Sequence, residues 1–126
     1  MRFANHRCLV VDDSATFGAA VRGLLEDAGV TVVGTATTLE TAVAAANLHA
    51  PDLILVDIDL GVESGFDAVE ALNRAQPEAV LILVSTHDQE DFADMVEASS
   101  AIAFLPKFEL SADLILETVE RGASAT

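Results

Sequence analysis

The chain has 126 residues, 52% of them hydrophobic, and carries a formal net charge of -15 from 21 acidic and six basic residues. This length suits one compact domain with a single hydrophobic core. The negative charge repels phosphate backbones and anionic lipids, so we expect no direct binding to nucleic acid or to membranes.

Targeting and redox signals are absent from the sequence. No apolar run approaches the roughly 18 residues of a membrane span. The N-terminal stretch MRFANHRCLVV lacks the long apolar region and cleavage site of a signal peptide. We therefore expect a cytoplasmic protein. The single cysteine, Cys8, lies within the apolar run CLVV, which favours a core residue over a reactive thiol.

Five apolar runs predict five strands, at residues 8–11, 31–36, 53–56, 79–84 and 101–105. Most of these runs are continuously apolar, which is typical of a parallel sheet covered by helices on both faces. Segments with helical periodicity separate them. Right-handed crossovers fold such a (βα)5 chain into a doubly wound three-layer sandwich.

The helix ends carry recognisable signals. The predicted N-caps are four hydroxyl residues, Ser14, Thr38, Ser64 and Ser111. Gly29 and Gly122 stand where helices are expected to stop. We expect one domain over residues 1–126, with a core at about 6–121 and a flexible tail at 122–126.

Unusual residues follow the predicted strands. They are Asp12 and Asp13 after the first strand, Asp57 and then Asp59 after the third, Ser85 after the fourth, and Lys107 after the fifth. Ligands of open α/β sheets bind at the carboxyl ends of the strands. Because Lys107 is the only lysine in the chain, general surface composition does not explain its position. The aspartates supply it with an obvious partner.

Converging carboxylates repel one another unless a cation neutralises them. A hard divalent ion such as Mg²⁺, or Mn²⁺, accepts such oxygen ligands, so Asp12, Asp13 and Asp57 are candidate metal ligands. Taken alone, Asp12 and Asp13 could instead serve the dipole of the following helix. Asp57 on the neighbouring strand favours the metal site.

A carboxylate can also attack phosphorus and form an aspartyl phosphate. Such chemistry needs a metal to neutralise oxygens and a cation on the phosphoryl group. Asp57 is the candidate nucleophile, while Lys107 and the hydroxyl of Ser85 are candidates to contact the phosphoryl oxygens.

With these residues in place, the chain resembles the receiver domain of two-component response regulators, including the chemotaxis regulators. The resemblance covers roughly residues 6–121. It rests on VVDDS (10–14), LILVDIDLGVESG (53–65), LVST (83–86) and FLPK (104–107), in the order of the family. It implies the flavodoxin-like strand order 2-1-3-4-5.

The resemblance also implies roles for individual residues. Asp57 is the phosphoacceptor, Asp12 and Asp13 are Mg²⁺ ligands, Ser85 is the switch hydroxyl and Lys107 is the phosphoryl-binding cation. The backbone carbonyl of Asp59 completes the protein's metal ligands. Phe104 takes the place of the aromatic switch residue, although a core phenylalanine is an equal alternative. The side chains of Asp59 and His87 occupy positions that tune the hydrolysis of the aspartyl phosphate.

The implied function is a phosphorylation switch. A sensor histidine kinase, a phosphotransfer protein or a small phosphodonor phosphorylates Asp57. The surface of the fourth helix, fifth strand and fifth helix, here 89–121, then binds an effector protein or a second copy. Such a protein promotes its own phosphorylation and dephosphorylation and is not a turnover enzyme.

Two alternatives remain open at this point. Asp57-Ile58-Asp59 also fits a small phosphatase of the haloacid dehalogenase type. That motif lies on the third strand rather than the first, Asp12 and Asp13 have no role in it, and 126 residues leave little room for a cap. The second alternative is a receiver-like interaction module that is never phosphorylated.

Overall fold

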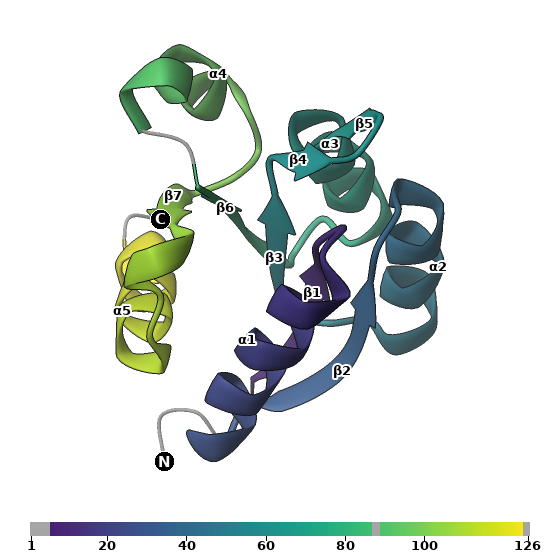
Figure 1. The fold of residues 1–126 in the computed structure, drawn as a ribbon, viewed down its shortest axis with the longest axis vertical. Helices are drawn as coiled ribbons and strands as arrows, with labels where there is room; N and C mark the ends of the chain where they lie inside the picture. Colours follow the sequence, from purple (N-terminus) through teal and green to yellow (C-terminus); the bar gives the residue numbers. More distant parts are fainter. Residues whose placement is uncertain (1–5, 87–88, 125–126) are drawn as a thin grey trace.

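The computed structural model describes residues 6–86 and 89–124, which build a five-stranded parallel sheet with helices on both sides (Figure 1). The sheet has the order β2-β1-β3-β6-β7. Its strands are β1 (Arg7–Val11), β2 (Thr31–Ala36), β3 (Leu53–Asp57), β6 (Val80–Ser85) and β7 (Ala103–Pro106). In chain order this arrangement is 2-1-3-4-5, so the predicted fold is confirmed.

Five α-helices and two short 3₁₀ helices accompany the sheet. The α-helices are α1 (Ala15–Asp27), α2 (Leu39–His49), α3 (Gly65–Ala75), α4 (Ala93–Ala98) and α5 (Ala112–Ser124). The 3₁₀ helices are η1 (Gln89–Phe92) and η2 (Lys107–Glu109). No helix in the described ranges has the length and apolar character that crossing a bilayer requires.

Alternate residues of each strand face opposite sides of the sheet and build two hydrophobic clusters. Leu9, Val11 and Ile54 face α2 and α3, whereas Val10 and Leu55 face α1 and α5. Cys8 is fully buried in the second cluster, as predicted, and burial raises the pKa of its thiol. The two clusters make the three layers of the sandwich.

The predicted caps are all present. The hydroxyls of Ser14, Thr38, Ser64 and Ser111 accept hydrogen bonds from backbone N–H groups in the first turns of α1, α2, α3 and α5. Gly29 follows the end of α1 with a φ of 92°, a left-handed conformation that favours glycine. These local signals therefore set where the helices begin relative to the strand ends.

Several boundaries differ from the sequence predictions, and β1 begins one residue earlier and β3 ends one residue later than expected. The fourth and fifth strands of the sheet lie at Val80–Ser85 and Ala103–Pro106, one or two residues later than expected. Helix α5 continues through position 122 to Ser124, so the prediction that a glycine stops it there is wrong. The segment after β3 forms a small antiparallel hairpin, β4 (Asp59–Leu60) and β5 (Glu63–Ser64), that we did not predict.

Helix α3 begins directly against the end of β3. The Gly65 N–H donates a hydrogen bond to the carbonyl of Ile58 at 2.6 Å. A Cβ atom at position 65 would lie 2.6 Å from Ile58 Cα and closer still to the carbonyl oxygen of Asp57. Only glycine fits this approach, which packs the start of α3 against the peptide bond between Asp57 and Ile58.

We expect Gly65→Ala to lower the free energy of unfolding by about 2 kcal/mol or more, because the added methyl group forces two backbone segments apart. Gly23→Ala is the matched control. Its Cβ meets nothing within 4 Å, and it lies inside α1. Replacing glycine in a helix interior should raise stability by about 0.5–1 kcal/mol. Urea unfolding of both variants measures the difference, and equal stabilities would contradict this account of position 65.

Candidate functional site

Side chains from separate segments meet at the carboxyl edge of the sheet. Asp12 follows β1, Asp57 ends β3, Ser85 ends β6 and Lys107 follows β7. Parallel pairing places Asp57 beside Val84, the neighbour of Ser85 in β6. The sheet order thus brings together residues that are up to 95 positions apart in the sequence.

Three carboxylates form the centre of the site. Asp12, Asp13 and Asp57 each offer an oxygen, and these oxygens lie within 4.8 Å of one another. Asp12 and Asp57 are only 2% and 3% exposed, whereas Asp13 is exposed. Asp12 accepts a hydrogen bond from the Ser14 N–H at 2.8 Å, and Asp57 accepts one from the Asp59 N–H at 3.2 Å. Backbone donors therefore orient both buried carboxylates.

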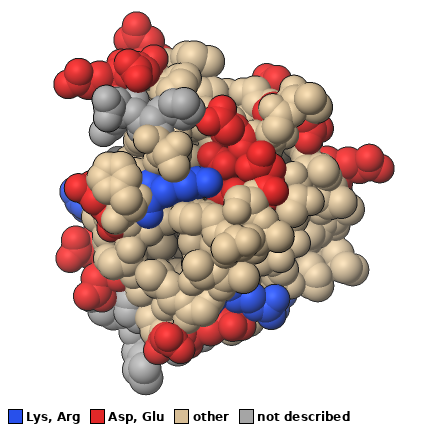
Figure 2. All heavy atoms as spheres, viewed as in Figure 1, with Lys and Arg blue, Asp and Glu red and all other residues tan. Residues whose placement is uncertain are grey.

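Lys107 connects the two buried carboxylates. Its Nζ lies 2.7 Å from Asp12 Oδ2 and 3.1 Å from Asp57 Oδ2. The same Nζ lies 4.2 Å from the centroid of the Phe17 ring, in a cation–π contact. Figure 2 shows basic and acidic atoms meeting in the middle of this face. Lys107 is therefore held on three sides.

The surroundings shift the ionisation of both groups. Burial and the neighbouring charge of Asp12 raise the pKa of Asp57 to about 6, although the Asp59 N–H and Lys107 act in the opposite direction. Burial lowers the pKa of Lys107, but its contacts with Asp12 and Asp57 outweigh burial and leave that pKa above its ordinary value. At neutral pH the site thus holds a permanent cation among carboxylates.

The donor set fits a divalent cation. Three carboxylates and one ammonium leave an excess negative charge at the sheet edge. Asp12 Oδ2 is buried and forms an ion pair with Lys107. Among the described residues, no group makes a hydrogen bond of standard geometry to this oxygen. That oxygen keeps a lone pair for a ligand, and hard ions such as Mg²⁺ prefer carboxylate oxygens. Asp12, Asp13 and Asp57 are the residues that could hold one.

The remaining predicted residues lie at different depths. Ser85 is fully buried at the end of β6, and Phe104 is 5% exposed within the cluster that faces α2 and α3. The side chain of Asp59 is exposed beside the metal-ligand candidates. His87 lies outside the described residues.

Phe17 is a part of the site that we did not predict. Its spacing from Val21 and Leu24 indicated only the buried face of a helix. Its contact with Lys107 depends on how α1 and the segment after β7 lie relative to each other. An aromatic residue in the first turn after Asp12 and Asp13 was the only available signal.

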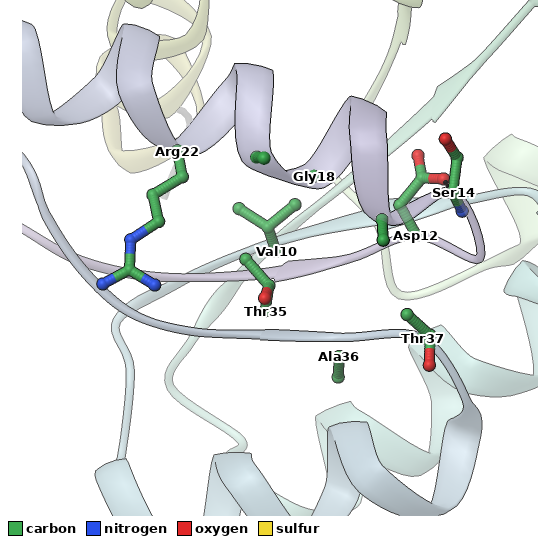
Figure 3. Close-up of a pocket in the computed structure, with 10 residues that line it drawn as sticks. Val10, Asp12, Ser14, Gly18, Arg22, Thr35, Ala36 and Thr37 are labelled. Carbon is green, nitrogen blue, oxygen red and sulfur yellow. Dashed lines mark hydrogen bonds between the residues drawn. The ribbon is translucent and has the colours of Figure 1, made fainter.

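A small cavity opens beside Asp12, between α1 and β2 (Figure 3). Its volume is about 140 Å³. Gly18 and Ala36 leave the space free, with Asp12 and Ser14 at one end and Arg22 at the other. A volume of this size holds about four or five waters. The cavity thus provides room for solvent next to Asp12, between α1 and the sheet.

Comparison with known proteins identifies the family. A family model of the response regulator receiver domain matches residues 8–120. The chain belongs to this family. The match includes every strand of the sheet and all five α-helices. It leaves out only the first residue of β1 and the last turn of α5. The resemblance inferred from the sequence is therefore confirmed, and the phosphatase alternative is not favoured.

Several relatives of this receiver domain are longer enzymes. The protein-glutamate methylesterase/protein-glutamine glutaminase of Idiomarina loihiensis is 38% identical over 103 residues, which make up 80% of this chain and 27% of that protein. The corresponding protein of Alkalilimnicola ehrlichii is 37% identical over 120 residues, which make up 91% of this chain and 30% of that protein. The chain thus spans less than a third of the length of these two relatives.

Solved structures share the fold over almost the full chain. The chemotaxis protein CheY4 of Vibrio cholerae superposes with a TM-score of 0.80 and 27% identity, covering 92% of this chain and 97% of that one. The receiver domain of a modulated diguanylate cyclase from Desulfovibrio desulfuricans gives a TM-score of 0.80 and 26% identity, with coverage of 92% and 91%.

The raised pKa of Asp57 predicts a pH-dependent stability. With a folded pKa of about 6 and an ordinary value of 3.8, the folded chain binds more protons at this carboxyl than the unfolded chain does. This carboxyl therefore makes the free energy of unfolding fall as the pH rises from about 3.8 to about 6.

Asp57→Asn removes the free-energy cost of holding an ionised carboxylate at this buried position. We expect the variant to be more stable than the wild type by about 1–3 kcal/mol near neutral pH in the presence of a chelator. The difference should shrink on acidification to about pH 4, where Asp57 is protonated in the folded protein. Denaturant unfolding at several pH values measures it. Asp27→Asn, at an exposed position in α1, is the control and should change stability by less than about 0.5 kcal/mol. A destabilised Asp57→Asn at neutral pH would contradict the prediction.

Proposed function

We propose that Asp57 of this receiver domain accepts a phosphoryl group and that the resulting charge controls the binding of a partner. The observation that carries the proposal is the buried Asp57 carboxylate, held between Lys107 and the oxygens of Asp12 and Asp13. Such a site offers a nucleophile, a cation for the phosphoryl group and ligands for a metal.

In the transfer step, a carboxylate oxygen of Asp57 attacks the phosphorus of the donor. A new O–P bond forms while the bond from phosphorus to the leaving group breaks, and the electron pair leaves with that group. The leaving group is a histidine side chain of a kinase or phosphotransfer protein, or the acetate of acetyl phosphate. With a pKa of about 6, most Asp57 carboxyls are ionised at neutral pH and can attack.

The residues around Asp57 then take complementary roles. Asp12 and Asp13, with Asp57 and the backbone carbonyl of Asp59, would hold Mg²⁺ or Mn²⁺. Such an ion supplies positive charge to the oxygens of the phosphoryl group. Lys107 keeps its place beside Asp57 and donates to a phosphoryl oxygen, because Phe17 and Asp12 hold its ammonium from other sides.

The switch follows from the new charge. Ser85 is the hydroxyl that donates to the phosphoryl group, and its movement is coupled to Phe104, which lies buried one strand away. The equilibrium between two arrangements of residues 89–121 shifts as a result. This surface binds an effector protein or a second copy of the chain.

Hydrolysis resets the switch. The side chains of Asp59 and His87 tune the lifetime of the aspartyl phosphate. The chain thus promotes its own phosphorylation and dephosphorylation without turning over a separate substrate. Residues 1–126 act as one receiver domain, in the cytoplasm, under a sensor histidine kinase or a phosphotransfer protein. The formal charge of -15 disfavours direct contact with nucleic acid or anionic membranes.

We expect intact-mass measurement after incubation with acetyl phosphate and Mg²⁺ to show one phosphoryl adduct per chain. Asp57→Asn and chelation should each abolish the adduct, because one removes the nucleophile and the other the metal. Asp27→Asn, an exposed aspartate away from the site, should form the adduct as the wild type does.

An unchanged adduct on Asp57→Asn would refute the assignment of the phosphoacceptor. Absence of any adduct, together with absence of Mg²⁺ binding, would instead support a receiver-like module that works without phosphorylation.

A further inference from the structure

Two adjoining cavities form a groove on the α3 side of the molecule. One, of about 260 Å³, lies between the β4–β5 hairpin, the start of α3, and the η1–α4 segment. The other, of about 250 Å³, lies between α3 and α4. Phe66 and Met95 line both cavities, which therefore join into a single depression. We refer to the two cavities together as the α3–α4 groove.

The floor of the α3–α4 groove is apolar and reaches solvent. Met95 is 50% exposed, and Val62 at its edge is fully exposed. The rings of Phe66 and Phe92 lie 6.0 Å apart with a tilt of 41° and form the base. Large apolar side chains that share one exposed depression are typical of an interaction surface.

The rim of the groove is acidic. Four acidic residues line its cavities, Asp59, Glu63, Asp67 and Glu70, and none of the other described lining residues is basic. Exposed carboxylates at positions 94 and 97 add to this charge on α4. Figure 2 shows acidic side chains over the part of this face where α4 and the β4–β5 hairpin lie. An occupant with positive charge around apolar anchors complements this surface.

Two of the rim carboxylates are fixed in place by the fold. Glu63 accepts a hydrogen bond from the Leu39 N–H at 2.9 Å, at the start of α2. Glu70 accepts bonds from the N–H and the hydroxyl of Ser100, both at 2.8 Å. These two carboxylates are therefore preorganised.

The walls of the groove favour a helical occupant. Helices α3 and α4 present no strand edge, and each strand of the hairpin has only two residues. Within the described residues, an added strand would therefore find at most a two-residue edge with which to pair here. A segment whose own backbone hydrogen bonds are complete, an α-helix, can enter without leaving buried polar groups unsatisfied.

We propose that the α3–α4 groove binds a cationic amphipathic helix of a partner protein. Two apolar side chains of that helix, three or four residues apart, occupy the two cavities. Its Lys and Arg residues face the acidic rim. The groove shares α4 with the surface at residues 89–121, but its other wall is formed by α3 and the β4–β5 hairpin, which lie outside that surface. The proposal does not depend on phosphoryl transfer at Asp57.

The test uses a synthetic helix as the probe. A helix-stapled peptide of about 16 residues, with leucines at positions i and i+4 and lysines on the flanks, is titrated into the ¹⁵N-labelled protein. We expect amide shifts centred on Phe66, Met95 and Ala98, and affinity that falls with added salt. A peptide of the same composition with the leucines on opposite faces controls for attraction to the overall charge of -15.

Matched substitutions locate the binding energy. We expect Met95→Ala and Asp67→Asn each to weaken binding by at least about threefold, because one removes an apolar contact and the other a rim charge. Leu48→Ala and Glu40→Gln should leave affinity within about twofold. They remove the same kinds of group from α2, at Leu48 (77% exposed) and at exposed Glu40.

Three outcomes would overturn the proposal. The first is equal affinity for the two peptides, which would mean that net charge alone attracts the probe. The second is a set of shifts centred on the carboxylates of Asp12, Asp13 and Asp57. The third is no binding by the amphipathic peptide. Thermal unfolding of each variant verifies that it is folded, since all four positions are exposed.

Discussion

The repulsion between buried carboxylates is the constraint on which the rest of the structure depends. Asp12 and Asp57 are almost completely buried, and no apolar environment tolerates two such charges without a cation nearby. Lys107 meets both, but only because β7 pairs with β6 and β6 with β3. A different strand order would leave the two acids without a cation. The ion pairs of the site therefore favour this order of strands, and this order in turn brings Lys107 to the acids.

The sequence predicts those features of the fold that depend on local patterns. Continuous apolar runs indicate the strands, and hydroxyl residues before the helices indicate their starts. The acidic cluster follows because the carboxyl ends of parallel strands share one edge. The β4–β5 hairpin escapes prediction because two-residue strands have no periodicity, and Phe17 escapes because its role depends on how α1 packs. Helix α5 passes position 122 because a glycine weakens a helix without ending it.

The five α-helices are not held to the sheet equally. Helices α2 and α3 pack through fully buried residues such as Ala42, Ala46 and Ala68, whereas α4 has six residues and none of them is buried. Phe92 and Val96, both partly buried, anchor this segment to the core. Elements with few buried contacts open at the lowest free-energy cost. The helix that borders the groove is thus also the one that the fold constrains least.

The single lysine has a practical consequence for anyone who handles this protein. Apart from the α-amino group, Lys107 carries the chain's only primary amine, but its ammonium is ion-paired and its side chain is only 13% exposed. Amine-directed dyes, cross-linkers and biosensor surfaces therefore react with the α-amino group, whose ordinary pKa is about 8, before they reach Lys107. Selective ¹⁵N labelling of the lysine side chain gives one ammonium resonance that needs no assignment. That resonance reports directly on the charge next to Asp57.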